Sequence, residues 1–124
     1  MKNKYIDLID QTFHFPQEEF ELDDQANLKF HGIDLTALIE EYGTPLKFTY
    51  LPKISHNIQR AKGWFKNAIE ETDYKGKYHY CYCTKSSHFK HVLDEALRND
   101  IHIETSSAFD INIVKKLKTE GKIT

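Results

Sequence analysis

Hydrophobic residues follow a strand-like period and then a helical period from Leu46 onward. Residues 46–50 alternate between apolar and polar side chains, which predicts a β-strand. The next stretch carries the longest helical stripe of the chain: Ile54, Ile58, Ala61, Trp64, Phe65, Ala68 and Ile69. Pro52 stands near the start of this stripe, where a missing N–H costs little. We therefore predict a strand over 46–50 and a helix from Pro52 to about Thr72.

A second strand is predicted over Tyr78–Thr84, where the side chains alternate again. Three tyrosines share one face, and the other face carries a histidine and two cysteines: His79, Cys81 and Cys83. We expect both faces to be largely buried, as in a barrel strand that lies under an outer helix. A helix is expected to start at Ser86 and Ser87, and its apolar stripe follows: Phe89, Val92, Leu93, Ala96 and Leu97.

A third strand and helix continue the alternation. Residues Ile101–Thr105 predict a strand, and Ser107 with Asp110 three residues later matches a helix-capping pattern. The helix that follows is expected to bury three apolar residues: Ile111, Val114 and Leu117. Strands that alternate with helices indicate a parallel α/β fold. Three such units cannot close an eight-stranded barrel, so we expect the fold to be incomplete in this chain.

The first 41 residues follow no single period. Residues 28–33 predict a short strand and a turn around Gly32. Asp34 can cap a short helix over Leu35–Tyr42, and Gly43 stands where such a helix would end. We assign residues 1–41 to an N-terminal lead-in segment and residues 42–124 to the α/β part of the chain.

Composition and charge limit the classes of function. Of the 124 residues, 40% are hydrophobic and 29% are charged, and the formal net charge is −2. This balance predicts no partner among nucleic acids or anionic membranes. No apolar run reaches the roughly 20 residues that cross a bilayer, and residues 1–10 lack the apolar segment of a secretory signal. We therefore expect a cytoplasmic protein in which Cys81 and Cys83 are reduced thiols.

Chemistry is expected where the parallel strands end, since such folds bind ligands beyond the carboxyl ends of their strands. Two places qualify, Thr84–Ser87 and Glu104–Ser107. Lys85 is the candidate nucleophile, because an aromatic strand would partly desolvate its amine and favour the neutral form that attacks an aldehyde. The alternative is a strand-end lysine that reaches into solvent. Glu104 is either an acid, a base or a partner for Lys85, or an ordinary carboxylate before a helix.

A metal site is an alternative interpretation of the second strand. Four potential ligands stand on or near it: His79, Cys81, Cys83 and His88. The single residue between the two cysteines is shorter than the usual gap in structural zinc sites, and the chain has no second cysteine pair. We therefore predict no metal site, and we interpret the cysteines as small core residues. Ser86 and Ser87 are interpreted as helix caps.

Three segments in order resemble the opening of the alanine-racemase-like, PLP-dependent decarboxylases, which include ornithine, diaminopimelate and arginine decarboxylases. Residues Tyr42–Leu46 are similar to the family's Tyr-Gly-Thr-Pro entry. Residues Tyr82–Ser87 are similar to its Tyr-Ala-Val-Lys-Ala-Asn stretch at the cofactor lysine, with the tyrosine and the lysine kept and the other four positions different. Residues Ile103–Asp110 resemble the next strand and helix start, where an acidic residue precedes an Ala/Gly-Ser pair. Together they look most like the bacterial biosynthetic arginine decarboxylases.

The resemblance implies a fold, a cofactor and a substrate. Residues 42–124 would form the first βα units of a PLP-binding, fold type III, TIM-type (β/α)8 barrel, and residues 1–41 would belong partly to the family's β-rich second domain. Lys85 would be both the catalytic and the cofactor-binding residue, joined to pyridoxal 5′-phosphate (PLP) as a Schiff base. The implied substrate is arginine, converted to agmatine and CO2 in polyamine biosynthesis. The family builds its sites between subunits, so a homodimer or a larger oligomer is expected for the full-length form.

Other groups of the family's site have no counterpart in these 124 residues. They are the histidine stacked on the cofactor, the glycine-rich phosphate cradle, the acidic partner of the pyridine nitrogen and the substrate-binding C-terminal residues. We therefore expect this chain, as an N-terminal fragment of the enzyme, to be inactive alone. Two alternatives stay open on the resemblance: a non-catalytic PLP-binding or regulatory barrel protein, and a diaminopimelate or ornithine decarboxylase. A third is a small α/β domain in which Lys85 has no chemical role.

Overall fold

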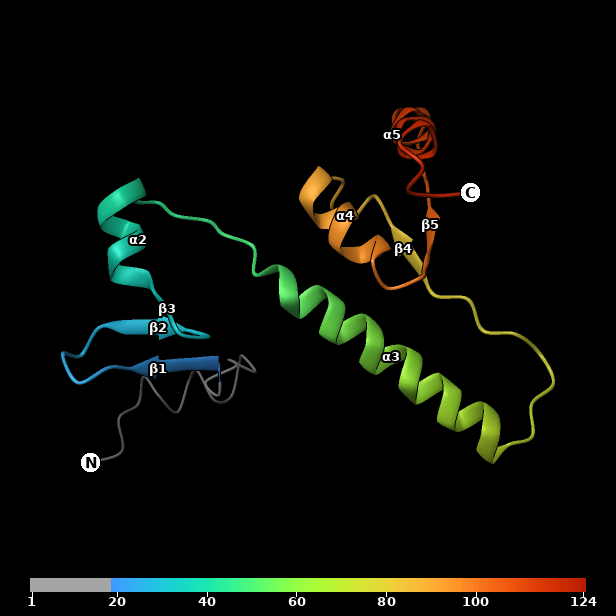
Figure 1. Cartoon of the computed structure of the whole chain (residues 1–124), viewed down its shortest axis with the longest axis horizontal. Coiled ribbons are helices and arrows are strands. Elements are labelled where there is room, and N and C mark those ends of the chain that lie inside the picture. Colours follow the sequence, from blue (N-terminus) through green and yellow to red (C-terminus); the bar gives the residue numbers. More distant parts are fainter. Residues whose placement is uncertain (1–18) are drawn as a thin grey trace, which may run out of the picture. The chain divides into compact units, whose positions relative to one another are not determined.

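The computed structural model describes residues 19–124, which belong to two compact units (Figure 1). The first unit ends at Phe48 and the second runs from Thr49 to Thr124. The prediction that residues 1–10 carry no secretory signal lies outside the described residues, as does the start of the lead-in segment. That residues 1–41 belong to the family's second domain stays a prediction.

The first unit contains an antiparallel sheet of three short strands. The strands are β1 (Phe20–Leu22), β2 (Leu28–Phe30) and β3 (Ile33–Asp34). Phe20 pairs with Phe30 across the sheet, and their rings lie 4.9 Å apart. The ring of Phe48 lies 5.7 Å from that of Phe30 and extends this aromatic cluster. The predicted strand and turn over 28–33 are confirmed, because Gly32 has a φ of +77° in the turn between β2 and β3.

A short helix, α2 (Leu35–Tyr42), follows the sheet as predicted. The Asp34 carboxylate accepts hydrogen bonds from the first free N–H groups of the helix, at 2.8 Å from Thr36 N and 3.1 Å from Ala37 N. Gly43 ends the helix with a φ of +78° and a ψ of −175°, a conformation that is essentially restricted to glycine. The cap and the glycine therefore fix both ends of α2.

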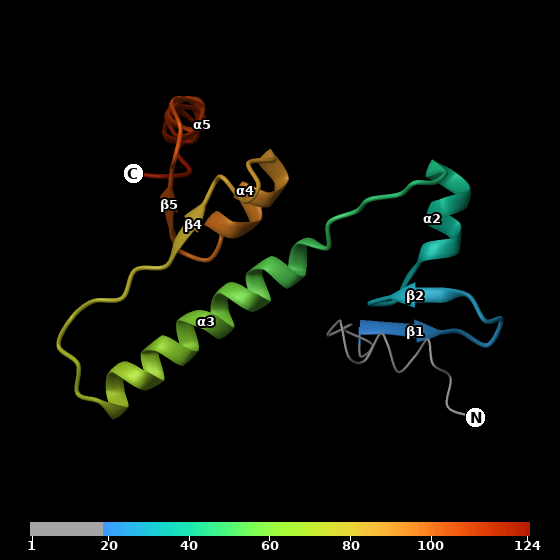
Figure 2. The same cartoon turned by 180° about the vertical axis from the view of Figure 1, so that it is seen from behind.

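The second unit alternates helices with two parallel strands. Its elements are α3 (Leu51–Glu71), β4 (Cys81–Cys83), α4 (Lys90–Leu97), β5 (His102–Glu104) and α5 (Ala108–Thr119). Strands β4 and β5 lie side by side in both views (Figures 1 and 2). The predicted α/β class is confirmed, and both strands fall inside their predicted ranges. The observed sheet has two strands, so the barrel itself stays a proposal.

The core of this unit lies where α3 meets α4. Ile58 of α3 is 2% exposed, and α4 contributes three buried residues: Val92, Leu93 and Ala96. Leu117 of α5 is buried as well. The second half of α3 is less covered, since Trp64 is 61% exposed. Phe65 stacks on Tyr78 with ring centroids 4.2 Å apart, which places Tyr78, three residues before β4, against α3.

A buried amide joins α3 to the end of α4. Asn99 is 6% exposed, and its Nδ2 donates to Ser55 Oγ at 2.8 Å and to the carbonyl oxygen of Glu95 at 2.9 Å. Its Oδ1 accepts a hydrogen bond of 2.9 Å from Gln59 Nε2. Ser55 Oγ in turn donates to Glu95 Oε1 at 2.5 Å. This polar network supplies hydrogen-bond partners for the last carbonyl groups of α4 and fixes the position of this helix on α3.

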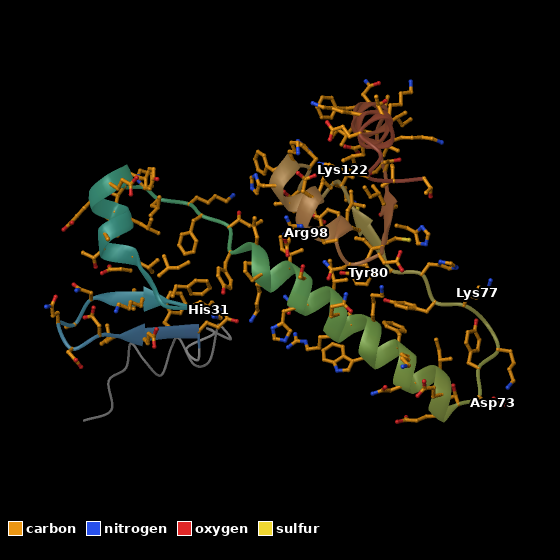
Figure 3. The ribbon with its side chains drawn as sticks, in the orientation of Figure 1. His31, Asp73, Lys77, Tyr80, Arg98 and Lys122 are labelled. Carbon is orange, nitrogen blue, oxygen red and sulfur yellow. The ribbon has the colours of Figure 1, made fainter. Side chains whose placement is uncertain are left out.

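Ion pairs hold the C-terminal segment, residues 120–124, against α4. Lys122, labelled in Figure 3, forms ion pairs with Asp94 of α4 and, at 3.3 Å, with Glu120. Hydrogen bonds from Lys122 and Lys90 hold the pKa of Asp94 below its ordinary value, although burial acts in the opposite direction. These contacts keep the end of the chain against α4.

None of the helices in the described part of the chain is long and apolar enough to span a bilayer.

The predicted strand over 46–50 is wrong. These residues belong to no helix or strand, and Tyr50 precedes the first turn of α3. An alternating pattern forms a strand only when a neighbouring strand supplies backbone partners. Among residues 19–124 the parallel strands β4 and β5 pair only with each other.

The helix after β4 starts later than predicted, at Lys90, and the serine pair does not cap it. Ser86 N donates to Cys83 O at 3.1 Å and closes a turn. The carbonyl oxygen of Ser87 accepts a hydrogen bond of 3.0 Å from the Tyr82 hydroxyl. The serines therefore shape the loop that follows β4.

Burial was predicted too generously in three places. Ile111 is 49% exposed on α5, whereas Leu117 on the same helix is buried. Both cysteines are free thiols. Cys81 is exposed and Cys83 is half-buried, so neither is a core residue. His79 is also exposed. The three tyrosines that alternate with these residues are half-buried, and Tyr78 stacks on Phe65 of α3.

Candidate functional site

The candidate site lies at the carboxyl ends of β4 and β5. Cys83 pairs with Glu104 at the last position of both strands. The next residue, Thr84, has 0% exposure and is bonded twice to the Glu104 carbonyl oxygen, from its N–H at 3.1 Å and from its hydroxyl at 3.3 Å. The two predicted places, 84–87 and 104–107, therefore meet at this edge of the sheet.

Lys85 follows Thr84 directly and lies in the turn that Ser86 closes. Its side chain is exposed, so the predicted desolvation of the amine is wrong for the structure of this chain. The reason is local, because the turn carries Lys85 beyond the last paired residue of β4. The amine is accessible, and the backbone on both sides of it is fixed by hydrogen bonds of Thr84 and Ser86.

Tyr82 fixes the far side of the same loop. Its hydroxyl donates to the Ser87 carbonyl oxygen, five residues along the chain. Burial raises the pKa of Tyr82 above its ordinary value, and the hydrogen bond to Ser87 offsets this only in part. Tyr82 therefore stays a neutral donor across the physiological pH range and holds the loop that carries Lys85.

Asp110 connects the edge of the sheet to α5 and is 4% exposed. Its Oδ2 accepts hydrogen bonds of 2.9 Å from Ser107 Oγ and 3.4 Å from Ser106 N, and Ser107 Oγ accepts from Asp110 N at 3.2 Å. The predicted capping pattern is confirmed. Burial acts to raise the pKa of Asp110, but the hydrogen bonds from Ser107, Thr84 and Ser106 and the charge of His88 outweigh it, so the pKa is lowered. The buried carboxylate is therefore ionised at neutral pH.

Glu104 lies at the end of β5 and is exposed. Its backbone carbonyl binds Thr84, while its carboxylate forms no ion pair with Lys85. The partnership with Lys85 that the sequence left open is therefore not formed in this structure. Glu104 contributes to the site through its backbone.

The potential metal ligands of the β4 segment are divided between two places. His88 lies against Phe109 of α5, with ring centroids 5.6 Å apart. His79 instead faces His102, and the two ring nitrogens, Nδ1 and Nε2, are 3.1 Å apart. Within residues 19–124 no three side chains of the His, Cys, Asp and Glu types converge as metal ligands. Sequence reasoning missed the contact between the histidines, because it depends on the register of β4 and β5.

Comparisons with protein-family models, with curated proteins and with solved structures find no match for this chain. Support for a function therefore comes from the three sequence segments that resemble the decarboxylases and from the turn that presents Lys85. The strand ends present an accessible amine on a backbone that hydrogen bonds hold on both sides.

Proposed function

We propose that this chain is the N-terminal part of a PLP-dependent amino-acid decarboxylase and that Lys85 holds the cofactor. One observation carries the proposal: an exposed lysine follows a parallel strand inside a turn that is bonded on both sides. The units β4–α4 and β5–α5 are proposed to be consecutive units of a TIM-type barrel, in which catalytic groups follow the strand ends. The resemblance of residues 82–87 to the family's cofactor-lysine segment supports the same assignment.

The residues at the edge of the sheet fit the aldehyde end of PLP. Lys85 offers an exposed primary amine, and the neutral form of a primary amine forms a Schiff base with an aldehyde. Thr84 is buried and bonded to β5, so it fixes the direction in which the chain leaves β4. When bound, PLP supplies an electron sink for the electron pair that loss of CO2 leaves on the substrate α-carbon. Asp110 holds the start of α5 beside this edge as an ionised carboxylate.

The proposed reaction is the conversion of arginine to agmatine. The bond between the α-carbon and the carboxylate breaks, CO2 leaves, and a proton takes its place on the α-carbon. Arginine is proposed as the substrate because the segments around Lys85 and Glu104 look most like the arginine decarboxylases. The groups that would bind the far end of the substrate are expected outside residues 1–124.

The cofactor assignment can be tested on the 124-residue chain. The protein is incubated with PLP, reduced with borohydride and digested, and the modified lysines are located by mass spectrometry. We expect the label to be concentrated on Lys85 and to disappear in Lys85→Arg, which keeps the charge but removes the primary amine. Lys77→Arg is the matched control, since Lys77 is also exposed and stands before β4 (Figure 3). Labelling spread evenly over the lysines would remove the basis for PLP binding at Lys85.

The reaction needs a separate test on the full product of the gene. CO2 release is measured with arginine, ornithine, lysine and diaminopimelate as substrates in the presence of PLP. We expect arginine to be preferred and Lys85→Arg to be inactive. Preference for ornithine or diaminopimelate would correct the substrate but not the class. Labelling of Lys85 without CO2 release from any of the four would favour the non-catalytic PLP-binding protein.

A further inference from the structure

We infer that His79 and His102 form a binding site for a divalent transition-metal ion on the open face of the β4–β5 sheet. The observation is a hydrogen bond of 3.1 Å between His79 Nδ1 and His102 Nε2, in which the tautomers decide which nitrogen donates. The two rings are 5.0 Å apart and inclined by 64°, so they do not stack. Imidazole nitrogen is a preferred donor for zinc, copper and nickel ions.

The distance suits two ligands of one ion. With metal–nitrogen bonds of about 2.0–2.1 Å, two nitrogens are about 3.3 Å apart in a tetrahedral site and about 2.9 Å apart in a square-planar one. The observed separation lies between these values. Both side chains are exposed, so small rotations of the rings direct both lone pairs towards an ion at low cost.

The backbone holds the two histidines in place. His102 N donates to the Tyr80 carbonyl oxygen at 2.9 Å, one residue after His79. Cys81 is paired with His102 in the parallel register, so these two side chains share a face of the sheet. His79 stands two residues before Cys81 and lies on the same face. The strands therefore pre-organise the two donors before any ion arrives. Water completes the coordination shell, because the described residues bring no third ligand to this point.

The inferred site is separate from the proposed PLP site. His79 precedes β4 and Lys85 follows it, and the six residue steps from one to the other correspond to about 20 Å of extended chain. Metal binding and the labelling of Lys85 are therefore expected to be independent. A bound ion would join β4 to β5 through side chains, in addition to the backbone bonds.

The test is titration of the chelator-treated 124-residue chain with Zn²⁺ by calorimetry. We expect one ion per chain, with binding weakened about tenfold or more in His79→Gln and in His102→Gln, since even outer-shell partners of a metal site are worth about 10–100-fold. His91→Gln is the matched control, because His91 is exposed on α4 away from this pair. Lys85→Ala is expected to bind Zn²⁺ as the unsubstituted chain does.

A second measurement uses the unsubstituted chain. Addition of Cu²⁺ below one equivalent is expected to broaden the imidazole NMR signals of His79 and His102 before those of His88 and His91. The inference is overturned if broadening begins at His88 or His91, or if the two glutamine variants bind Zn²⁺ as tightly as the control. Binding that is lost in Cys81→Ser and kept in His79→Gln would also overturn it, because the ligand would then be the thiolate.

Discussion

Removal of the Asn99 amide is expected to destabilise the second unit more than any change in exposed residues of α3. The amide joins the two helices through Ser55 and Gln59 and also donates to the Glu95 carbonyl oxygen at the end of α4. In Asn99→Ala these groups lose their partner while the surrounding side chains stay partly buried. Such losses are costly because the remaining donors and acceptors are left without hydrogen bonds.

The size of the effect follows from the number of bonds between the helices. Two of them, to Ser55 and from Gln59, join α3 to the end of α4. At about 1 kcal/mol net for each, and with the Glu95 carbonyl oxygen left without its donor, Asn99→Ala is expected to lower the free energy of unfolding by about 2–3 kcal/mol. Asn57→Ala is the matched control, because Asn57 is exposed on α3, and surface changes usually stay within about 0.5 kcal/mol.

Urea unfolding followed by circular dichroism and by the fluorescence of Trp64, the chain's one tryptophan, measures the effect. With a slope of about 2 kcal/mol per M, the midpoint of Asn99→Ala is expected to fall by about 1 M. A double-mutant cycle with Ser55→Ala then isolates the bond between the helices, and a coupling of about 0.5 kcal/mol or more is expected for groups in contact. A coupling near zero, or a cost for Asn99→Ala no larger than that for Asn57→Ala, would refute this account of the network.

Changes at four further positions test other parts of the structure. Thr84→Val removes the hydroxyl that binds the Glu104 carbonyl oxygen and is expected to cost about 1–2 kcal/mol in urea unfolding, whereas Thr84→Ser keeps the hydroxyl and costs less. The pKa of Asp110 is lowered by folding, so its carboxylate stabilises the chain at neutral pH and loses this effect as the pH falls below 3.8. The difference in stability between the unsubstituted chain and Asp110→Asn is therefore expected to shrink below this pH. Gly43→Ala is expected to destabilise the first unit by about 1–3 kcal/mol because of its positive φ, whereas Gly63→Ala inside α3 is expected to stabilise the second by about 1 kcal/mol in thermal unfolding.

Local signals in the sequence were sufficient to predict the helices that have a strong cap or a long apolar stripe. Helix α2 begins after Asp34 and ends at Gly43, as predicted. Helix α5 begins after its predicted cap, Ser107. The long apolar stripe of α3 was also sufficient, because its period is independent of what packs on it. These features depend on residues within one or two turns of one another, which a single sequence contains.

The features that were predicted wrongly depend on contacts between distant parts of the chain. The segment 46–50 alternates like a strand but has no paired neighbour in the described structure. Ser86 and Ser87 resemble caps, but the Tyr82 hydroxyl and the Cys83 carbonyl oxygen bind them into a loop. The sequence left open whether Lys85 is partly desolvated or reaches into solvent, because that depends on where pairing of β4 with β5 stops.

The meeting of the two strand ends was predicted correctly, and the buried Thr84 within it was missed. Parallel strands bring their carboxyl ends to one edge, so 84–87 and 104–107 had to be neighbours once the strands were identified. Thr84 carried no signal of its own beyond its position next to Lys85. Its role becomes visible only through its bonds to the Glu104 backbone.

The pairing of β4 with β5 also has a kinetic consequence. Thr84 and Glu104 are 20 residues apart in the chain, and the eight-residue helix α4 lies between them. Closing a flexible loop costs conformational entropy before the strand contacts repay it, whereas a helix that forms early shortens the chain to be closed. We expect α4 to be formed when the strands first meet, so changes in α4 should alter the folding rate, and changes at Thr84 should mainly alter the unfolding rate.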